Sequence, residues 1–193
     1  MGTNSSPDEA MSLTIGVLGS ARLSDPDPRA ATARELGRTL AEAGWHVMTG
    51  GYGGLMAEVS HGAAQVGGLV IGLPMEHWAQ VTPNEWNHEL RWSRTYPERL
   101  GHLLACDAIV ALDGGIGTLA EASVIWSALQ TEPAAPPLVA VGRPWRTLLT
   151  AIASNLVVDA DDLAHVIAVD GPADVVGAIR AAWATERSAA PRG

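Results

Sequence analysis

The residues of this chain that could do chemistry are concentrated in one segment, residues 113–121, whose sequence is DGGIGTLAE. An apolar run at 108–112 precedes it and is typical of a short buried strand, while the residues that follow recur at helical spacing. Glycines let the backbone approach a ligand, and the first N–H groups of a helix have no partners within it. The order of strand, glycine turn and helix therefore predicts a phosphate site. Its expected residues are Gly114, Gly115, Ile116, Gly117 and Thr118.

Two roles are open for Glu121. Thr118 and Glu121 have the T-x-x-E spacing of a capping box, in which the glutamate reaches back to the start of the helix. The alternative is a chemical role, in which the carboxylate faces a bound ligand. The motif alone does not separate the two, but the other glycine turns described below favour the chemical role.

Arg99 is a second candidate. It follows Pro97, a residue common at the first position of a helix, and the leucines after it form one apolar helical face. An arginine is unfavourable beside the positive end of a helix dipole unless an anion is near. Arg99 is therefore expected to hold an anion, and the alternatives are a solvated surface arginine or a partner for Glu98.

Composition excludes several classes of function. All twelve basic side chains are arginines, so neither a lysine Schiff base nor a Walker-type phosphate loop is possible. The net charge of −9 disfavours nucleic acid and anionic membranes but allows a small nucleotide as partner. The single cysteine, Cys106, is expected to be buried and inert. Because one cysteine cannot form a disulfide within the chain, a reducing compartment such as the cytoplasm is the expected location. His77 and His88 lack a metal-ligand spacing, so no metal site is predicted. No cofactor is predicted either.

Strands and helices alternate along the chain. This pattern predicts an α/β, Rossmann-like, doubly wound and mainly parallel sheet with helices on both faces. A single domain is expected at 13–187, with a disordered tail at 1–12 and a frayed end at 188–193. The expected strands are 13–18, 45–49, 69–73, 89–92, 108–112, 138–141 and 166–169.

Two stretches are predicted to be irregular. Residues 74–92 are expected to form a long loop that ends in the short strand at 89–92. Residues 159–162 are expected to form a solvated acidic turn. Trp78 and Trp86 lie in the long loop, where they could cover a ligand base or pack the loop onto the domain. Packing is the favoured interpretation for both tryptophans.

Three of the expected strands end in glycine turns. Because parallel strands have their carboxyl ends at one edge of a sheet, these turns are expected to converge on one crevice. None has the G-x-G-x-x-G pattern of a dinucleotide site, so a mononucleotide is the better prediction. Besides residues 114–118, the expected binding residues are Gly19, Ser20, Gly50, Gly51, Gly53, Gly54 and Met56.

These motifs resemble those of a known family. Residues 50–56 resemble the G-G-x-x-G-L-M segment, and residues 113–121 the P-G-G-x-G-T-x-x-E signature, of the LOG family of cytokinin riboside 5′-monophosphate phosphoribohydrolases, often mislabelled lysine decarboxylases. The resemblance implies a Rossmann-like fold, a homodimer or larger assembly, and hydrolysis of the N-glycosidic bond of an AMP-type nucleotide. It also implies that Arg99 and Glu121 are catalytic.

The chain departs from the LOG pattern at two informative positions. Asp113 replaces the proline of the signature, and Leu100 replaces the lysine that usually follows the arginine. An extra carboxylate beside a phosphate site is unfavourable by Coulomb's law unless it is turned away or hydrogen-bonded. These departures keep open a carrier that binds a nucleotide or cofactor without chemistry, resembling the molybdenum cofactor carriers of the wider superfamily.

Overall fold

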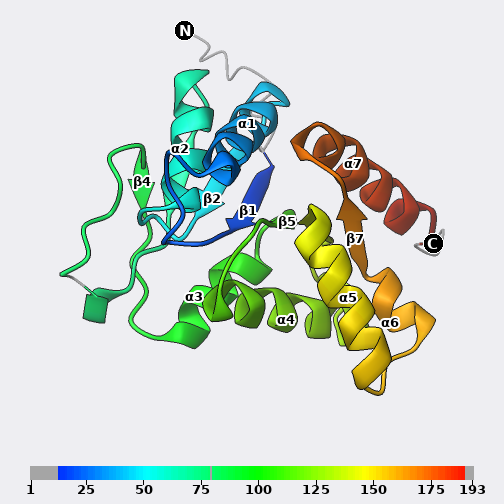
Figure 1. Ribbon diagram of the computed structural model, residues 1–193. Coiled ribbons are helices and arrows are strands. Elements are labelled where there is room, and N and C mark those ends of the chain that lie inside the picture. The colour runs from blue at the N-terminus through cyan, green and yellow to red at the C-terminus, as the bar shows by residue number, and fades with distance from the viewer. Residues whose placement is uncertain (1–12, 79, 190–193) are drawn as a thin grey trace, which may run out of the picture.

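A seven-stranded parallel sheet forms the centre of the computed structural model, which describes residues 13–78 and 80–189 (Figure 1). The strand order is β4-β3-β2-β1-β5-β6-β7, and every neighbouring pair is parallel, which confirms the predicted Rossmann-like fold. The strands are β1 (Thr14–Leu18), β2 (His46–Thr49), β3 (Val70–Gly72), β4 (Glu89–Leu90), β5 (Ala108–Ala111), β6 (Leu138–Val141) and β7 (Val166–Val169). The predicted tail at 1–12 and residues 190–193 of the predicted frayed end lie outside the described residues.

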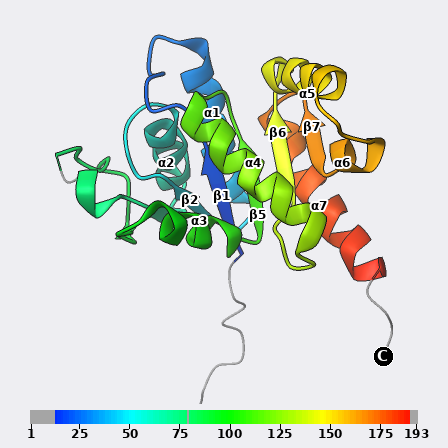
Figure 2. The ribbon, with the colours of Figure 1, turned by 90° about the horizontal axis from the view of Figure 1, so that it is seen from below.

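Helices cover both faces of the sheet. One apolar cluster joins the sheet to α1, α2 and α7, and a second joins its other face to α3, α4 and α5 (Figures 1 and 2). The strands β5, β6 and β7 are apolar throughout, as expected when side chains alternate between two apolar clusters: Val110 of β5 belongs to the first and Ile109 to the second. The helices are α1 (Pro28–Glu42), α2 (Leu55–Gln65), α3 (Tyr96–Leu104), α4 (Ile116–Thr131), α5 (Arg143–Asn155), α6 (Ala160–Ala164) and α7 (Pro172–Ala189). None of the described helices is both long and apolar enough to cross a membrane.

The order of the strands reverses between β1 and β5. The chain builds outward from β1 to β4 on one side, then returns to pair β5 with β1 and continues outward to β7. Ligands of open parallel sheets bind beside such a reversal, at the carboxyl ends of the strands. The turns after β1 and β5 are the two that flank this position.

The capping box that the sequence left open as the alternative role for Glu121 does not form at the start of α4. The helix begins at Ile116, two residues before Thr118, and its N-cap is Gly115, which makes no side-chain capping bond. Thr118 lies inside the first turn, where its side chain occupies the space that a Cβ at Gly114 would need. Glu121 is consequently one turn into the helix, with its side chain free to pair elsewhere.

Three smaller predictions also need correction. The acidic residues at 159–162 form the start of α6, because Asp159 caps the helix and Asp162 completes a capping box with it. Within the long loop, β4 spans only Glu89–Leu90 of the predicted 89–92, and a single 3₁₀ turn, η1 (Glu76–Trp78), precedes it. At the other end, α7 continues to Ala189 through the first residues of the predicted frayed end.

Candidate functional site

The three glycine turns meet beside the reversal of strand order. The backbone N–H of Ser20 donates to the carbonyl oxygen of Asp113 (3.0 Å), and that of Leu55 donates to the carbonyl oxygen of Ser20 (2.8 Å). Residues that follow β1, β2 and β5 are thereby joined through their backbones. A pocket of about 580 Å³ opens at this junction. It is called the Glu121 pocket below, after a charged side chain that lines it.

The first turn of α4 forms one wall of the Glu121 pocket. Gly115, Ile116, Gly117 and Thr118 all line it, and Ile116 is 82% exposed. A Cβ at Gly115 or Gly117 would meet nothing within 4 Å, so the backbone of this turn is accessible from outside. Because no side chain caps α4, the N–H groups of its first turn lack a capping partner. The turn has the features of an anion site.

A buried ion pair lies deeper in the same pocket. The Nε of Arg99 donates to Oε1 of Glu121 (3.1 Å), and its Nη1 donates to the carbonyl oxygen of Leu73. Each of the two charged residues is 8% exposed, and no other charged residue in the described ranges is buried. A buried ion pair costs desolvation energy and is weak evidence for stability, so this one points to a function in the pocket. No described residue donates to the second carboxylate oxygen of Glu121, Oε2.

The turn after β2 supports Arg99 from behind. A Cβ at Gly50 would lie 2.6 Å from Sδ of Met56 and 2.7 Å from Nη2 of Arg99, so only glycine leaves the guanidinium its place. Met56 lines the Glu121 pocket, as do Gly19 and Ser20 after β1. The predicted glycines of the second turn do not line it. These are Gly50, Gly51, Gly53 and Gly54.

Three aromatic side chains, Tyr52, Trp78 and Tyr96, form a further wall of the Glu121 pocket. Trp78 is 47% exposed, and its ring centroid lies 6.0 Å from that of Tyr52, whose hydroxyl accepts a hydrogen bond from the backbone N–H of Met75 (2.8 Å). Tyr96 also lines the pocket, and burial, aided by the charge of Glu121, raises the pKa of its phenol. No periodic pattern predicts this aromatic wall, because its residues come from irregular segments and from the start of a helix.

The two tryptophans of the long loop differ in their roles. The Trp86 ring stacks on His61 of α2, with centroids 4.1 Å apart and planes 9° from parallel, so its predicted packing role is confirmed. Trp78 instead lines the pocket. Cys106 is buried as predicted, and burial raises the pKa of its thiol to about 12, which leaves it inert at neutral pH. In the described part of the chain, no three His, Cys, Asp or Glu side chains are grouped to hold a metal ion.

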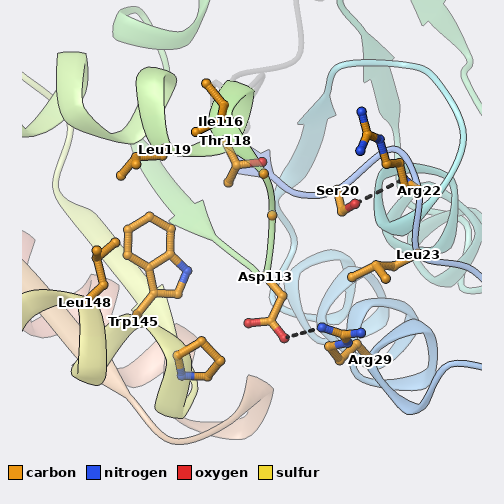
Figure 3. Close-up of a pocket in the computed structure, with 13 residues that line it drawn as sticks. Ser20, Arg22, Leu23, Arg29, Asp113, Ile116, Thr118, Leu119, Trp145 and Leu148 are labelled. Carbon is orange, nitrogen blue, oxygen red and sulfur yellow. Dashed lines mark hydrogen bonds and ion pairs between the residues drawn. The ribbon is translucent and has the colours of Figure 1, made fainter.

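The unexpected carboxylate of Asp113 faces away from the Glu121 pocket. It lines a different pocket, of about 560 Å³, in which Arg29 lies 3.7 Å from it (Figure 3). Trp145 forms part of the opposite wall, and its indole N–H donates to the carbonyl oxygen of Leu112 (3.1 Å). The cavity is called the Trp145 pocket below. Arg29 thus offsets a charge that would otherwise repel an anion at the start of α4.

Comparisons with known proteins agree with this architecture. A sequence model of the SLOG cluster4 family matches residues 12–132. The molybdenum cofactor carrier protein from Chlamydomonas reinhardtii is 25% identical, with a TM-score of 0.70 over 90% of this chain and 99% of that one. The molybdenum cofactor binding protein from the phototrophic bacterium Rippkaea orientalis is 19% identical, with a TM-score of 0.72 over 89% of this chain and 98% of that one. The structure of TM1055 is 22% identical, with a TM-score of 0.68 over 88% and 99% of the two chains. No curated protein matches the sequence.

Proposed function

The chain belongs to the SLOG cluster4 family, and we propose that it acts there as a phosphoribohydrolase, which cleaves the N-glycosidic bond of an AMP-type nucleoside 5′-monophosphate. The proposal includes the LOG-type activity and the homodimer that the sequence motifs imply. The observation that carries it is the buried Arg99–Glu121 pair, which lies in the pocket whose wall is the uncapped start of α4.

The pocket suggests how such a substrate is oriented. The 5′-phosphate binds the N–H groups at the start of α4 and the hydroxyl of Thr118. The ribose then lies one helical turn further on, beside Glu121, and the base lies against the aromatic wall that includes Trp78 and Tyr96. The three parts of the nucleotide each meet a surface of matching chemistry.

Glu121 is the group that faces the reacting carbon. Water attacks C1′ of the ribose as the bond from C1′ to the base nitrogen breaks, giving ribose 5-phosphate and the protonated free base. The carboxylate stabilises the positive charge that develops on the ribose and orients the water, as carboxylates do in glycoside hydrolysis. Arg99 holds Oε1 in place and leaves Oε2 directed to the reaction.

Release of free base from AMP, followed by chromatography, tests this proposal. We expect Glu121→Gln to lower the rate by about a hundredfold or more, because it removes the charge but keeps an acceptor for Arg99. Glu132→Gln is the matched control, since Glu132 is the exposed C-cap residue of the same helix. If folded wild-type protein releases no base from AMP or any other purine 5′-monophosphate, the proposal is wrong.

A non-catalytic carrier is the second candidate, supported by the likeness to the Chlamydomonas carrier along nearly the whole chain. A carrier binds its ligand in the same pocket and returns it unchanged. Thermal unfolding tests for a carrier, which is stabilised by a ligand that is afterwards recovered intact. In a carrier, neither the wild-type protein nor the Glu121→Gln variant releases free base. Appearance of free base in proportion to enzyme concentration excludes this candidate.

A further inference from the structure

The Glu121 pocket and the Trp145 pocket lie on two sides of the first turn of α4. Their volumes are similar, about 580 and 560 Å³, and each is large enough for a nucleoside-sized group. The two pockets share part of their lining, so they are adjacent, and the start of α4 forms a ridge between them. The shared residues are Ser20, Arg22, Gly115, Ile116 and Thr118.

The Trp145 pocket has an apolar wall suited to a planar ring. Leu119 of α4 and Leu148 of α5 flank the indole of Trp145 (Figure 3). The indole N–H of Trp145 donates to the carbonyl oxygen of Leu112, which holds the ring in a fixed orientation. Trp145 is 8% exposed, so it offers the pocket only a small part of its carbon surface, beside Leu119 and Leu148. A bound group gains contact with an aromatic surface but no hydrogen bond from it.

Of the two arginines that line the Trp145 pocket, one is ion-paired and the other is not. Arg29 pairs with Asp27 (2.6 Å) and Asp113 (3.7 Å), which together offset its charge. Arg22 lines both pockets at the ridge and makes no ion pair with any described residue. The free cation therefore lies next to the uncapped start of α4, where both favour an anion shared by the two pockets.

We propose that the Trp145 pocket binds a second ring-bearing group attached through phosphate to the nucleotide in the Glu121 pocket. The ligand is then a phosphate-linked pair of nucleosides whose phosphates lie on the ridge beside Arg22. This inference rests on the proposed function for the position of the first nucleoside. A monophosphate fills one pocket and leaves the other open.

The test compares three probes by titration calorimetry: AMP, ADP and P1,P2-di(adenosine-5′) diphosphate. ADP and the dinucleotide both carry two phosphates, so their difference reports the second nucleoside. We expect the dinucleotide to bind about tenfold more tightly than ADP, the gain expected when a second ring buries apolar surface in the Trp145 pocket. Equal affinity for the two probes overturns the inference.

Leu148→Trp provides the second arm, because the larger side chain fills the Trp145 pocket. It is expected to remove the dinucleotide's advantage over ADP and to leave AMP binding unchanged. Thr147→Trp is the matched control, since Thr147 is the exposed neighbour on α5 and lines neither pocket. Equal losses for AMP and the dinucleotide overturn the inference. Leu148-dependent dinucleotide binding without release of base from any purine 5′-monophosphate overturns the proposed function and supports the second pocket.

Discussion

The turn after β2 and the turn after β5 both connect a strand to a helix through glycines, yet they meet different surroundings. At residues 50–54 the turn is enclosed: the carbonyl oxygen of Gly51 accepts hydrogen bonds from Asn84 and Asn87, and Gly50 packs against Arg99. At residues 114–117 the turn is open, and Ile116 projects into solvent. The first turn positions side chains, and the second presents its own backbone. Glycine content alone does not distinguish the two turns, whereas most of their glycines do: a Cβ would meet close neighbours at Gly50, Gly51 and Gly54 but nothing within 4 Å at Gly115 and Gly117.

The largest effect is expected at Gly54, in the enclosed turn. Gly54 has φ 68° and ψ −144°, and a Cβ there would overlap the backbone of Ser20 and Ala21. Gly54→Ala should lower the free energy of unfolding by about 3 kcal/mol, because backbone strain and overpacking each contribute. Urea denaturation followed by circular dichroism measures the change.

Gly53→Ala is the control for this prediction, since a Cβ at Gly53 would meet nothing within 4 Å. It should change the free energy of unfolding by less than about 1 kcal/mol. Similar unfolding midpoints for the two variants would contradict the view that the turn is rigidly enclosed at Gly54.

The next largest effect is expected at Gly50, where a substitution should impair binding or activity more than it impairs stability. Gly50→Ala introduces a Cβ that conflicts with the ends of two flexible side chains, Met56 and Arg99, so the fold can adjust while the guanidinium moves. We expect AMP affinity, or the rate of base release, to fall by about ten- to a hundredfold, as when a positioned charged group is displaced. Calorimetry and the base-release assay measure this loss.

Stability provides the contrast for Gly50→Ala. Its free energy of unfolding should change by less than that of Gly54→Ala, because no backbone atom obstructs the new methyl group. A variant that loses stability and keeps full affinity would show that Gly50 serves the fold and not Arg99.

The fold could be predicted from the sequence because most of its strands are short, predominantly apolar and bounded by turn residues. The predicted strands at 138–141 and 166–169 match β6 and β7 at both ends. The edge strand β4 was overestimated, since it pairs only with β3 and at only two positions. The T-x-x-E spacing alone could not settle the role of Glu121, because it also fits a capping box, whereas in the fold the carboxylate of Glu121 pairs with Arg99.

The site was predictable in part. Arg99 and Glu121 are 22 positions apart, and no helical or strand period connects them, so their contact follows only from how α3 and α4 pack on one face of the sheet. The aromatic wall was harder to foresee, because Trp78 lies in a segment without periodicity and its exposure depends on the path of the loop. The Trp145 pocket joins residues from four separate segments of the chain and has no local signature.

The smallest effect tests the open turn. Ile116 is 82% exposed and lines both pockets, so its side chain contributes little to the fold and is placed to contact a ligand. Ile116→Ala should weaken AMP binding by about threefold, the loss expected when part of an aliphatic contact is removed. Its free energy of unfolding should stay within about 0.5 kcal/mol of wild type. Val157→Ala is the control, since Val157 is fully exposed and lines neither pocket. If both variants bind AMP as wild type does, the nucleotide does not contact the start of α4. The open turn at 114–117 would then differ from the enclosed turn in structure but not in function.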